Sequence, residues 1–90
     1  MALFPRENQL WLGNVPSKLN EGAALDELEA YSVRPFKLIL RQGKGGGWDQ
    51  YGIAYFSSTA LRMQAQRRLL EARWSSKAII LARPLMELSR

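Results

Sequence analysis

The sequence predicts an α+β domain in which a four-stranded antiparallel sheet carries two helices on one face. Segments of alternating side-chain character indicate four strands, and two segments with apolar residues at helical spacing indicate helices. Along the chain they follow the order strand, helix, strand, strand, helix, strand. A length of 90 residues is enough for one small domain and not for two. This order is typical of the split βαβ, or ferredoxin-like, sandwich, which leaves the second face of its sheet uncovered.

The first half of the chain is predicted to hold a lead-in, a strand and a helix. Residues 1–8 form the lead-in, and alternation over residues 9–14 predicts a strand that turns Trp11 to one face and its leucines to the other. Asn20 is the predicted N-cap of the first helix, which ends before the proline of residues 32–35. The apolar stripe of this helix is Ala24, Leu25, Leu28 and Tyr31.

Two further strands follow, joined by a glycine-rich loop over residues 42–49. Residues 36–41 predict a strand that turns one set of side chains to the helices, namely Phe36, Leu38 and Leu40. Its other face carries Lys37, Ile39 and Arg41. Residues 50–56 predict the third strand, with Gly52, Ala54 and Phe56 toward the helices.

The last part of the domain is predicted to be a helix and a strand. Ser57 or Ser58 caps the helix, and residues 77–82 form the strand, which Pro84 closes. The tail, residues 85–90, could add a helical turn that folds back over the sheet, but a frayed terminus is the simpler expectation. This second helix is predicted to run to about Ala72. Its inner stripe is Leu61, Ala65, Leu69 and Ala72.

The uncovered face of the sheet is predicted to carry large apolar side chains, where a wet sheet face is normally polar. Its aromatic residues are predicted to be Trp11, Tyr51 and Tyr55. Its aliphatic residues are predicted to be Ile39, Ile53 and Ile80. Such a face predicts a surface that another molecule covers.

The net charge of the chain indicates which class of molecule would cover this face. The chain has 13 Lys and Arg against 8 Asp and Glu, a net charge of +5 and a pI near 10.1, and basic domains attract polyanions. Residues 21–29 hold four of the eight acids, so the rest of the chain is more basic than the total. Without an apolar run of membrane-spanning length or a signal peptide, we expect no membrane association.

Two residue types are missing, and their absence bears on chemistry. Without histidine the chain lacks the commonest general acid–base group and the commonest transition-metal ligand. Without cysteine it lacks disulfides and thiolate zinc sites, which fits a reducing compartment. We therefore expect no enzyme, metal, cofactor or small-molecule substrate, and an intracellular protein, nuclear or cytoplasmic.

Three segments resemble the RNA recognition motif (RRM) family. LWLGNV, residues 10–15, is similar to the hexamer of the family's first strand, and DQYGIAYF, residues 49–56, to the octamer of its third strand. AIILARP, residues 78–84, is similar to the last strand, so the domain is expected to span residues 9–84. Two positions depart from the family: Asp49 replaces a basic residue, and Ile53 replaces a stacking aromatic residue.

The resemblance implies a module that binds single-stranded RNA, with single-stranded DNA less favoured. Trp11 and Tyr51 would stack on neighbouring bases, and Asn14 would bond a base edge. Tyr55 would partly replace the aromatic residue missing at Ile53. Phosphates would be neutralised by Lys37, Arg41 and Lys44. Trp48 could stack on a base, cover the sheet or lie exposed, and the sequence does not choose.

A protein-interaction domain is the alternative. The apolar sheet face could be a dimer seam or a protein contact surface. One branch of the family captures a tryptophan-bearing peptide with an acidic first helix and an Arg-x-Phe motif, and this chain resembles it only in part. The first helix supplies Asp26 and Glu29, but Arg73 is followed directly by the aromatic Trp74, at the wrong spacing.

Overall fold

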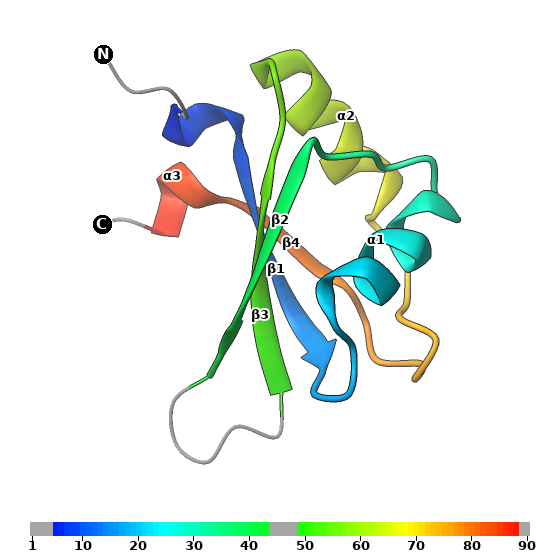
Figure 1. The fold of residues 1–90 in the computed structure, drawn as a ribbon. Helices are drawn as coiled ribbons and strands as arrows, with labels where there is room; N and C mark the ends of the chain where they lie inside the picture. Colours follow the sequence, from blue (N-terminus) through cyan, green and yellow to red (C-terminus); the bar gives the residue numbers. More distant parts are fainter. Residues whose placement is uncertain (1–4, 44–48, 89–90) are drawn as a thin grey trace.

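A four-stranded antiparallel sheet carries helices α1 and α2 on one of its faces, as Figure 1 shows. The computed structural model describes residues 5–43 and 49–88. The order of strands and helices confirms the predicted split βαβ fold. In chain order the described elements are η1 (Arg6–Asn8), β1 (Gln9–Pro16), α1 (Glu21–Glu29), β2 (Lys37–Gln42), β3 (Asp49–Tyr55), α2 (Thr59–Arg68), β4 (Leu81–Pro84) and α3 (Leu85–Leu88).

Strands β1 and β3 form the centre of the sheet, whose strand order is β2-β3-β1-β4. All three neighbouring pairs are antiparallel. In the middle of the sheet Ile39 of β2 lies opposite Ile53 of β3. Trp11 of β1 lies between Ile53 and Arg83 of β4. Because directly opposed residues share a face, these four side chains form one row across the sheet.

Both main helices begin at side-chain caps. The Asn20 side chain accepts a hydrogen bond from the Ala23 N–H at 2.8 Å, which confirms the predicted cap of α1. Ser58, rather than Ser57, caps α2, because its Oγ accepts from the Leu61 N–H at 3.1 Å. Helix α2 ends at Arg68, earlier than expected, and the rest of its predicted length is a turn.

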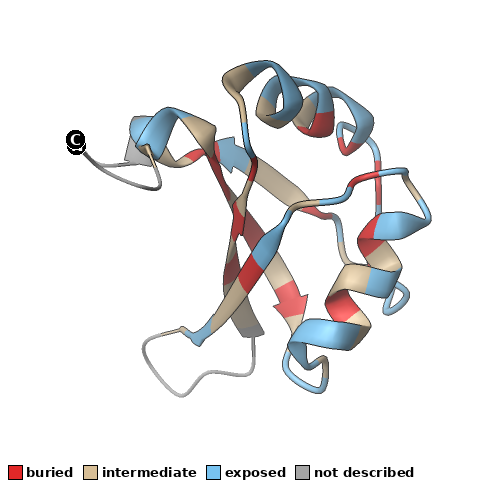
Figure 2. Cartoon of the chain, turned by 45° about the horizontal axis from the view of Figure 1, so that its top comes forward, coloured by how far each residue is buried: buried red, intermediate tan, exposed pale blue. Residues whose placement is uncertain are grey.

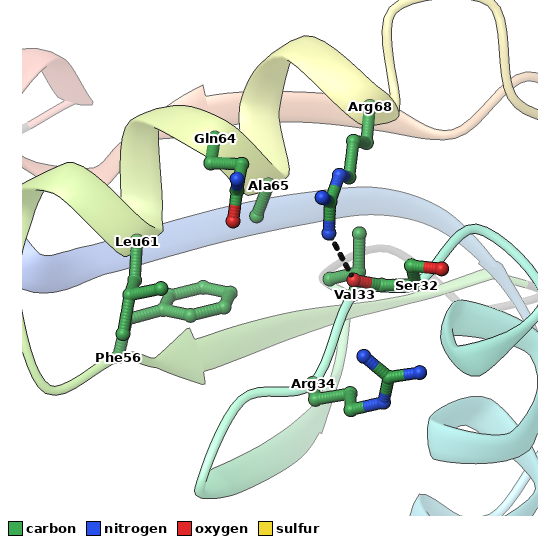
Figure 3. Close-up of a pocket in the computed structure, with 8 residues that line it drawn as sticks. All are labelled: Ser32, Val33, Arg34, Phe56, Leu61, Gln64, Ala65 and Arg68. Carbon is green, nitrogen blue, oxygen red and sulfur yellow. Dashed lines mark hydrogen bonds between the residues drawn. The ribbon is translucent and has the colours of Figure 1, made fainter.

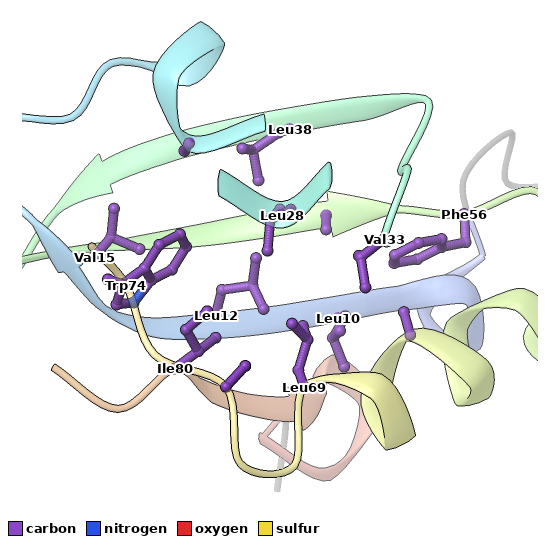
Figure 4. Close-up of a cluster of buried hydrophobic side chains, with 14 residues drawn as sticks. Leu10, Leu12, Val15, Leu28, Val33, Leu38, Phe56, Leu69, Trp74 and Ile80 are labelled. Atoms are coloured by element: carbon purple, nitrogen blue, oxygen red, sulfur yellow. The ribbon is translucent and has the colours of Figure 1, made fainter. Parts of the chain in front are cut away.

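The core lies between the sheet and the helices, where buried residues gather in Figure 2. Burial of one such leucine contributes about 1.5–3 kcal/mol. The inward positions predicted on β1 and β3 are confirmed, whereas Leu61, predicted inside, is 46% exposed in the first turn of α2. The buried apolar side chains, drawn in Figure 4, are Leu10, Leu12, Val15, Ala24, Leu28, Val33, Leu38, Ala54, Phe56, Ala65, Leu69, Ala72, Trp74 and Ile80.

Among the described residues, Trp74 is the largest fully buried side chain, with 1% of its surface exposed. Its Nε1–H donates a hydrogen bond to the Gly13 carbonyl oxygen at 3.1 Å, so the polar edge of the indole is satisfied inside the protein. Figure 4 shows the ring beside Val15 in the core. Trp74 is therefore a core residue, and its ring is not available to capture a peptide.

The last strand begins later than predicted and in the opposite register. Before it, the Ile80 N–H donates to the Ala72 carbonyl, and Arg73 pairs with Ile79. The residues before β4 thus pair with the segment after α2, and strand β4 covers only Leu81–Pro84. A shift of one residue exchanges the two faces of a strand. Ile80, predicted on the uncovered face, is accordingly in the core with 2% exposure.

The tail forms a helical turn rather than a frayed end. Helix α3 follows β4 directly and lies beside η1 and the start of β1, as Figure 1 shows. In the part of the chain that the structure describes, no helix is long and apolar enough to cross a membrane.

Candidate nucleic-acid interface

The sheet face turned away from α1 and α2, here called the open face, carries three rows of side chains. The middle row is Ile39, Ile53, Trp11 and Arg83. On one side of it lie Lys37, Tyr55 and Gln9. On the other side lie Arg41, Tyr51, Gly13 and Leu81. The open-face positions that the sequence predicts on β1, β2 and β3 are thus found there.

Trp11 and Tyr51 are neighbours on the open face. Their ring centroids lie 6.4 Å apart with an angle of 26° between the ring planes, and both side chains are half-buried. A Cβ atom built on Gly13 would lie 2.5 Å from Cη2 and 2.7 Å from Cζ3 of Trp11. The Cη2–Cζ3 edge of the indole therefore occupies the space above Gly13.

Tyr55 belongs to a separate cluster at the β2 edge. The centroid of its ring is 6.3 Å from the ring centroid of Phe36. Nζ of Lys37 lies 5.6 Å from the same Tyr55 centroid. Phe36, predicted to point under the helices, is instead 57% exposed. The alternation does not extend to Phe36, because β2 begins one residue later, at Lys37.

Asn14 lies at an irregular point of β1. The register of β1 against β3 shifts between Leu12 and Val15, and Asn14 adopts a φ of 60°. Its Nδ2 donates to the Ile79 carbonyl oxygen at 3.0 Å. The amide that the sequence predicts to bond a base thus also ties β1 to the segment before β4.

Basic side chains flank the aromatic pair from both edges of the sheet. Lys37 and Arg41 lie on β2, and Arg83 lies on β4 opposite Trp11. Arg83 was not among the predicted site residues, because residues 78–82 are all apolar and show no alternation. The arginine itself was a usable signal, because arginine is rarely buried under helices. Alternation back from an exposed Arg83 would have placed Leu81 on the open face and Ile80 in the core, as the structure does.

Three acids of α1 are bound by other parts of the chain, on the helix side of the sheet. The Glu21 carboxylate accepts from the Leu40 N–H at 3.2 Å. Glu27 accepts from the Ser75 N–H at 2.7 Å and from its hydroxyl at 2.6 Å. Glu29 pairs with Arg34 at 2.6 Å. Three of the four acids of residues 21–29 are thus engaged away from the open face.

The residues of the alternative, peptide-capturing site do not form one surface. Asp26 and Glu29 are exposed on α1, whereas Trp74 is buried. Between them, the Tyr31 hydroxyl donates to the Arg73 carbonyl at 3.0 Å and accepts from its N–H at 3.1 Å. The Arg73 guanidinium donates to the Lys77 carbonyl at 2.9 Å. The chain's own contacts thus occupy this seam.

Two predicted contributors lie outside the described residues, namely Lys44 and Trp48. Asp49 begins β3 opposite Pro16, and its side chain is likewise outside the described part. Within the described ranges, no group of three or more acidic, histidine or cysteine residues could hold a metal ion.

A pocket of about 230 Å³ opens between α2 and the segment that follows α1. Figure 3 shows Phe56 and Leu61 along one side of it and the hydrogen bond from Arg68 to the Ser32 carbonyl, at 2.7 Å, on another. Arg34 also lines this pocket, but its guanidinium is paired with Glu29. Both arginines of the pocket are thus bound within the chain.

Comparison with solved structures places this architecture among RRM domains. The third RRM of Mip6 superposes with a TM-score of 0.73 at 13% identity, over 92% of this chain and 99% of that one. The Rna15 RRM, solved with bound RNA (GU), gives 0.63 at 20% identity, over 84% and 80%. A Snu17p–Pml1p structure, an intermediate of RES complex assembly, gives 0.61 at 21% identity, over 88% and 69%.

The chain therefore has the fold of an RRM domain, as its resemblance implied. No protein-family model matches the sequence, and no curated protein is significantly similar to it.

Proposed function

We propose that this chain binds single-stranded RNA on its open face, with Trp11 and Tyr51 as the stacking platform. The observation that carries the proposal is the pair of half-exposed rings 6.4 Å apart, on a face with basic residues at both edges. Unstacked bases of a single strand gain about 1–3 kcal/mol each from stacking on such rings.

The basic residues would hold the phosphates. Lys37 and Arg41 lie at one edge of the platform and Arg83 at the other, so a strand crossing the sheet from β2 to β4 would meet a cation on either side. Lys44 remains a predicted contributor from the loop. The proposal assigns no catalytic step to these residues, which position and neutralise the ligand.

Affinity is expected to be modest. Ile53 lies between Ile39 and Trp11 and offers contact without a π face. We expect a Kd in the micromolar range or weaker, about −8 kcal/mol or less favourable. RNA is proposed over single-stranded DNA, in keeping with the Rna15 RRM that was solved with bound RNA.

A second candidate is a protein contact on the same face. The directly opposed Ile39 and Ile53, with Leu81 at the β4 edge, make part of the open face aliphatic. Such surfaces occur in protein interfaces, and the Snu17p neighbour was solved in a protein complex. The partner would be another protein or a second copy of this chain.

An NMR titration with random-sequence single-stranded RNA tests the proposal. We expect chemical-shift changes at Trp11, Tyr51 and Arg83, smaller ones with DNA of the same sequence, and weaker RNA binding by Trp11→Ala. Leu61→Ala, on the far side of the molecule, is the control and should bind as the native chain does. Shifts confined to α1 and α2 would contradict the proposal.

A further inference from the structure

A groove runs between α2 and β4. Two adjoining hollows, of about 330 Å³ and 260 Å³, share Gln66 and Leu70 as lining residues and together form it. One of them reaches Pro84, and the other follows the chain from Ile79 to Arg83. We call this feature the α2–β4 groove.

The floor and walls of the groove expose aliphatic side chains. Leu70 is 75% exposed, Ile79 47% and Met63 44%, which makes them three of the large apolar residues left in contact with water. A cluster of exposed apolar side chains around a hollow is typical of a surface that another molecule covers.

The rim of the groove is basic. Arg62, Arg67 and Arg83 line it, and among the described residues no acid does. Arg62 is used within the chain, since it donates to the Glu7 carbonyl at 3.0 Å and to Gln66 at 2.8 Å. In the described part of the chain no carboxylate pairs with Arg67 or Arg83. Two guanidinium groups are therefore available to a ligand.

We propose that the α2–β4 groove binds an acidic peptide segment of a partner protein, with aliphatic or aromatic side chains anchored beside Leu70 and carboxylates paired with Arg67 and Arg83. Charge complementarity selects this occupant, because an apolar floor takes anchor side chains and a basic rim takes carboxylates. No described aromatic residue lines the groove, so bases would find nothing there to stack on.

The groove shares Leu81 and Arg83 with the open face but not Trp11 or Tyr51, so the two proposals can fail separately. Arg67 and Leu70 belong to α2 and the turn after it, on the helix side of the sheet. Arg83 is shared, since it also lies opposite Trp11 on the open face, and it is therefore left unchanged in the test.

The test uses a displayed library of random peptides selected against the full chain. We expect enriched sequences that combine acids with large apolar residues. Titration of one enriched peptide should change the NMR chemical shifts of Leu70, Ile79 and Arg67. Arg67→Glu and Leu70→Asp should each weaken that peptide about tenfold or more. Their matched controls, Lys18→Glu and Leu61→Asp, should not, and far-UV circular dichroism confirms that each variant is folded.

Five outcomes would overturn the proposal. The first three are the absence of enriched peptides, enrichment of peptides without acids, and equal loss of peptide binding in the control variants. The fourth is weakened RNA binding in Arg67→Glu and Leu70→Asp, which would assign the groove to the RNA path. The fifth is self-association of the chain, measured by sedimentation, that Leu70→Asp abolishes. This result would assign the groove to a second copy of the chain instead.

Discussion

The indole of Trp11 lies in the space that a side chain on Gly13 would need, so these two residues of β1 form one part of the open face. Gly13 has no Cβ, and this lets the ring lie along the sheet rather than stand away from it. The position of the ring therefore depends on the absence of a side chain two residues further along the strand.

The substitution Gly13→Ala should displace the ring and weaken RNA binding by about tenfold, since the stacking geometry is lost. The new methyl group would also press on Leu81, 3.2 Å away. Fluorescence anisotropy with single-stranded RNA measures the loss, and the NMR signal of the Trp11 Nε1–H reports the ring. Gly22→Ala is the control, because a Cβ there meets only Asn20 Oδ1 at 3.6 Å. An undisturbed Trp11 signal in Gly13→Ala would contradict this account.

Replacement of either ring of the platform should cost binding while the fold is kept. Trp11→Ala and Tyr51→Ala are each expected to lose about 1–3 kcal/mol of RNA affinity. Because the rings are neighbours, the two losses should not add in the double variant. Isothermal titration calorimetry of the three variants gives the coupling. If Trp11→Ala unfolds the domain, the ring is a structural element and the platform is wrongly assigned.

Arg83 should contribute to the salt dependence of RNA binding. For single strands each phosphate contact contributes about 0.7 to the slope of log K against log salt. Arg83→Gln should lower the slope by about that amount, whereas Lys18→Gln, on the turn after β1, should leave it unchanged. Anisotropy titrations at several salt concentrations measure the slopes. An affinity that is independent of salt would count against nucleic acid as the ligand.

Trp74 should matter for stability and not for a peptide contact. Trp74→Ala removes a fully buried ring together with its hydrogen bond to Gly13, and should cost about 3–5 kcal/mol of unfolding free energy. Trp74→Phe keeps most of the volume and should cost less. Urea denaturation followed by circular dichroism distinguishes the two. A Trp74→Ala protein as stable as the native chain would show that the indole is not part of the core.

The sequence predicts the fold and most of the open face because its first three strands alternate clearly. Prediction fails where that signal is missing. Residues 78–82 are uniformly apolar, so their register is ambiguous and Arg83 is overlooked. Trp74 is misjudged for another reason: its burial depends on contacts between α1, β1 and the turn after α2, which no local pattern reveals. The α2–β4 groove is likewise a product of tertiary packing.

The last prediction concerns the two positions at which the chain departs from the family it resembles. Ile53 lies in the middle row beside Trp11, at a position where the family has a stacking ring. Asp49, predicted on the same face by alternation, replaces a basic residue and should repel a passing phosphate. The double change Asp49→Lys, Ile53→Phe should therefore tighten RNA binding at least about tenfold, or about 1.4 kcal/mol.

The single variants separate the two causes. Ile53→Phe adds a π face beside Trp11 and should strengthen binding at every salt concentration, whereas the gain from Asp49→Lys should fall as salt rises. Both variants are measured by anisotropy against the same RNA, with the fold checked by circular dichroism. If the double variant is folded and gains nothing, the open face does not serve single strands. The aliphatic row of Ile39 and Ile53 would then favour a protein as its ligand.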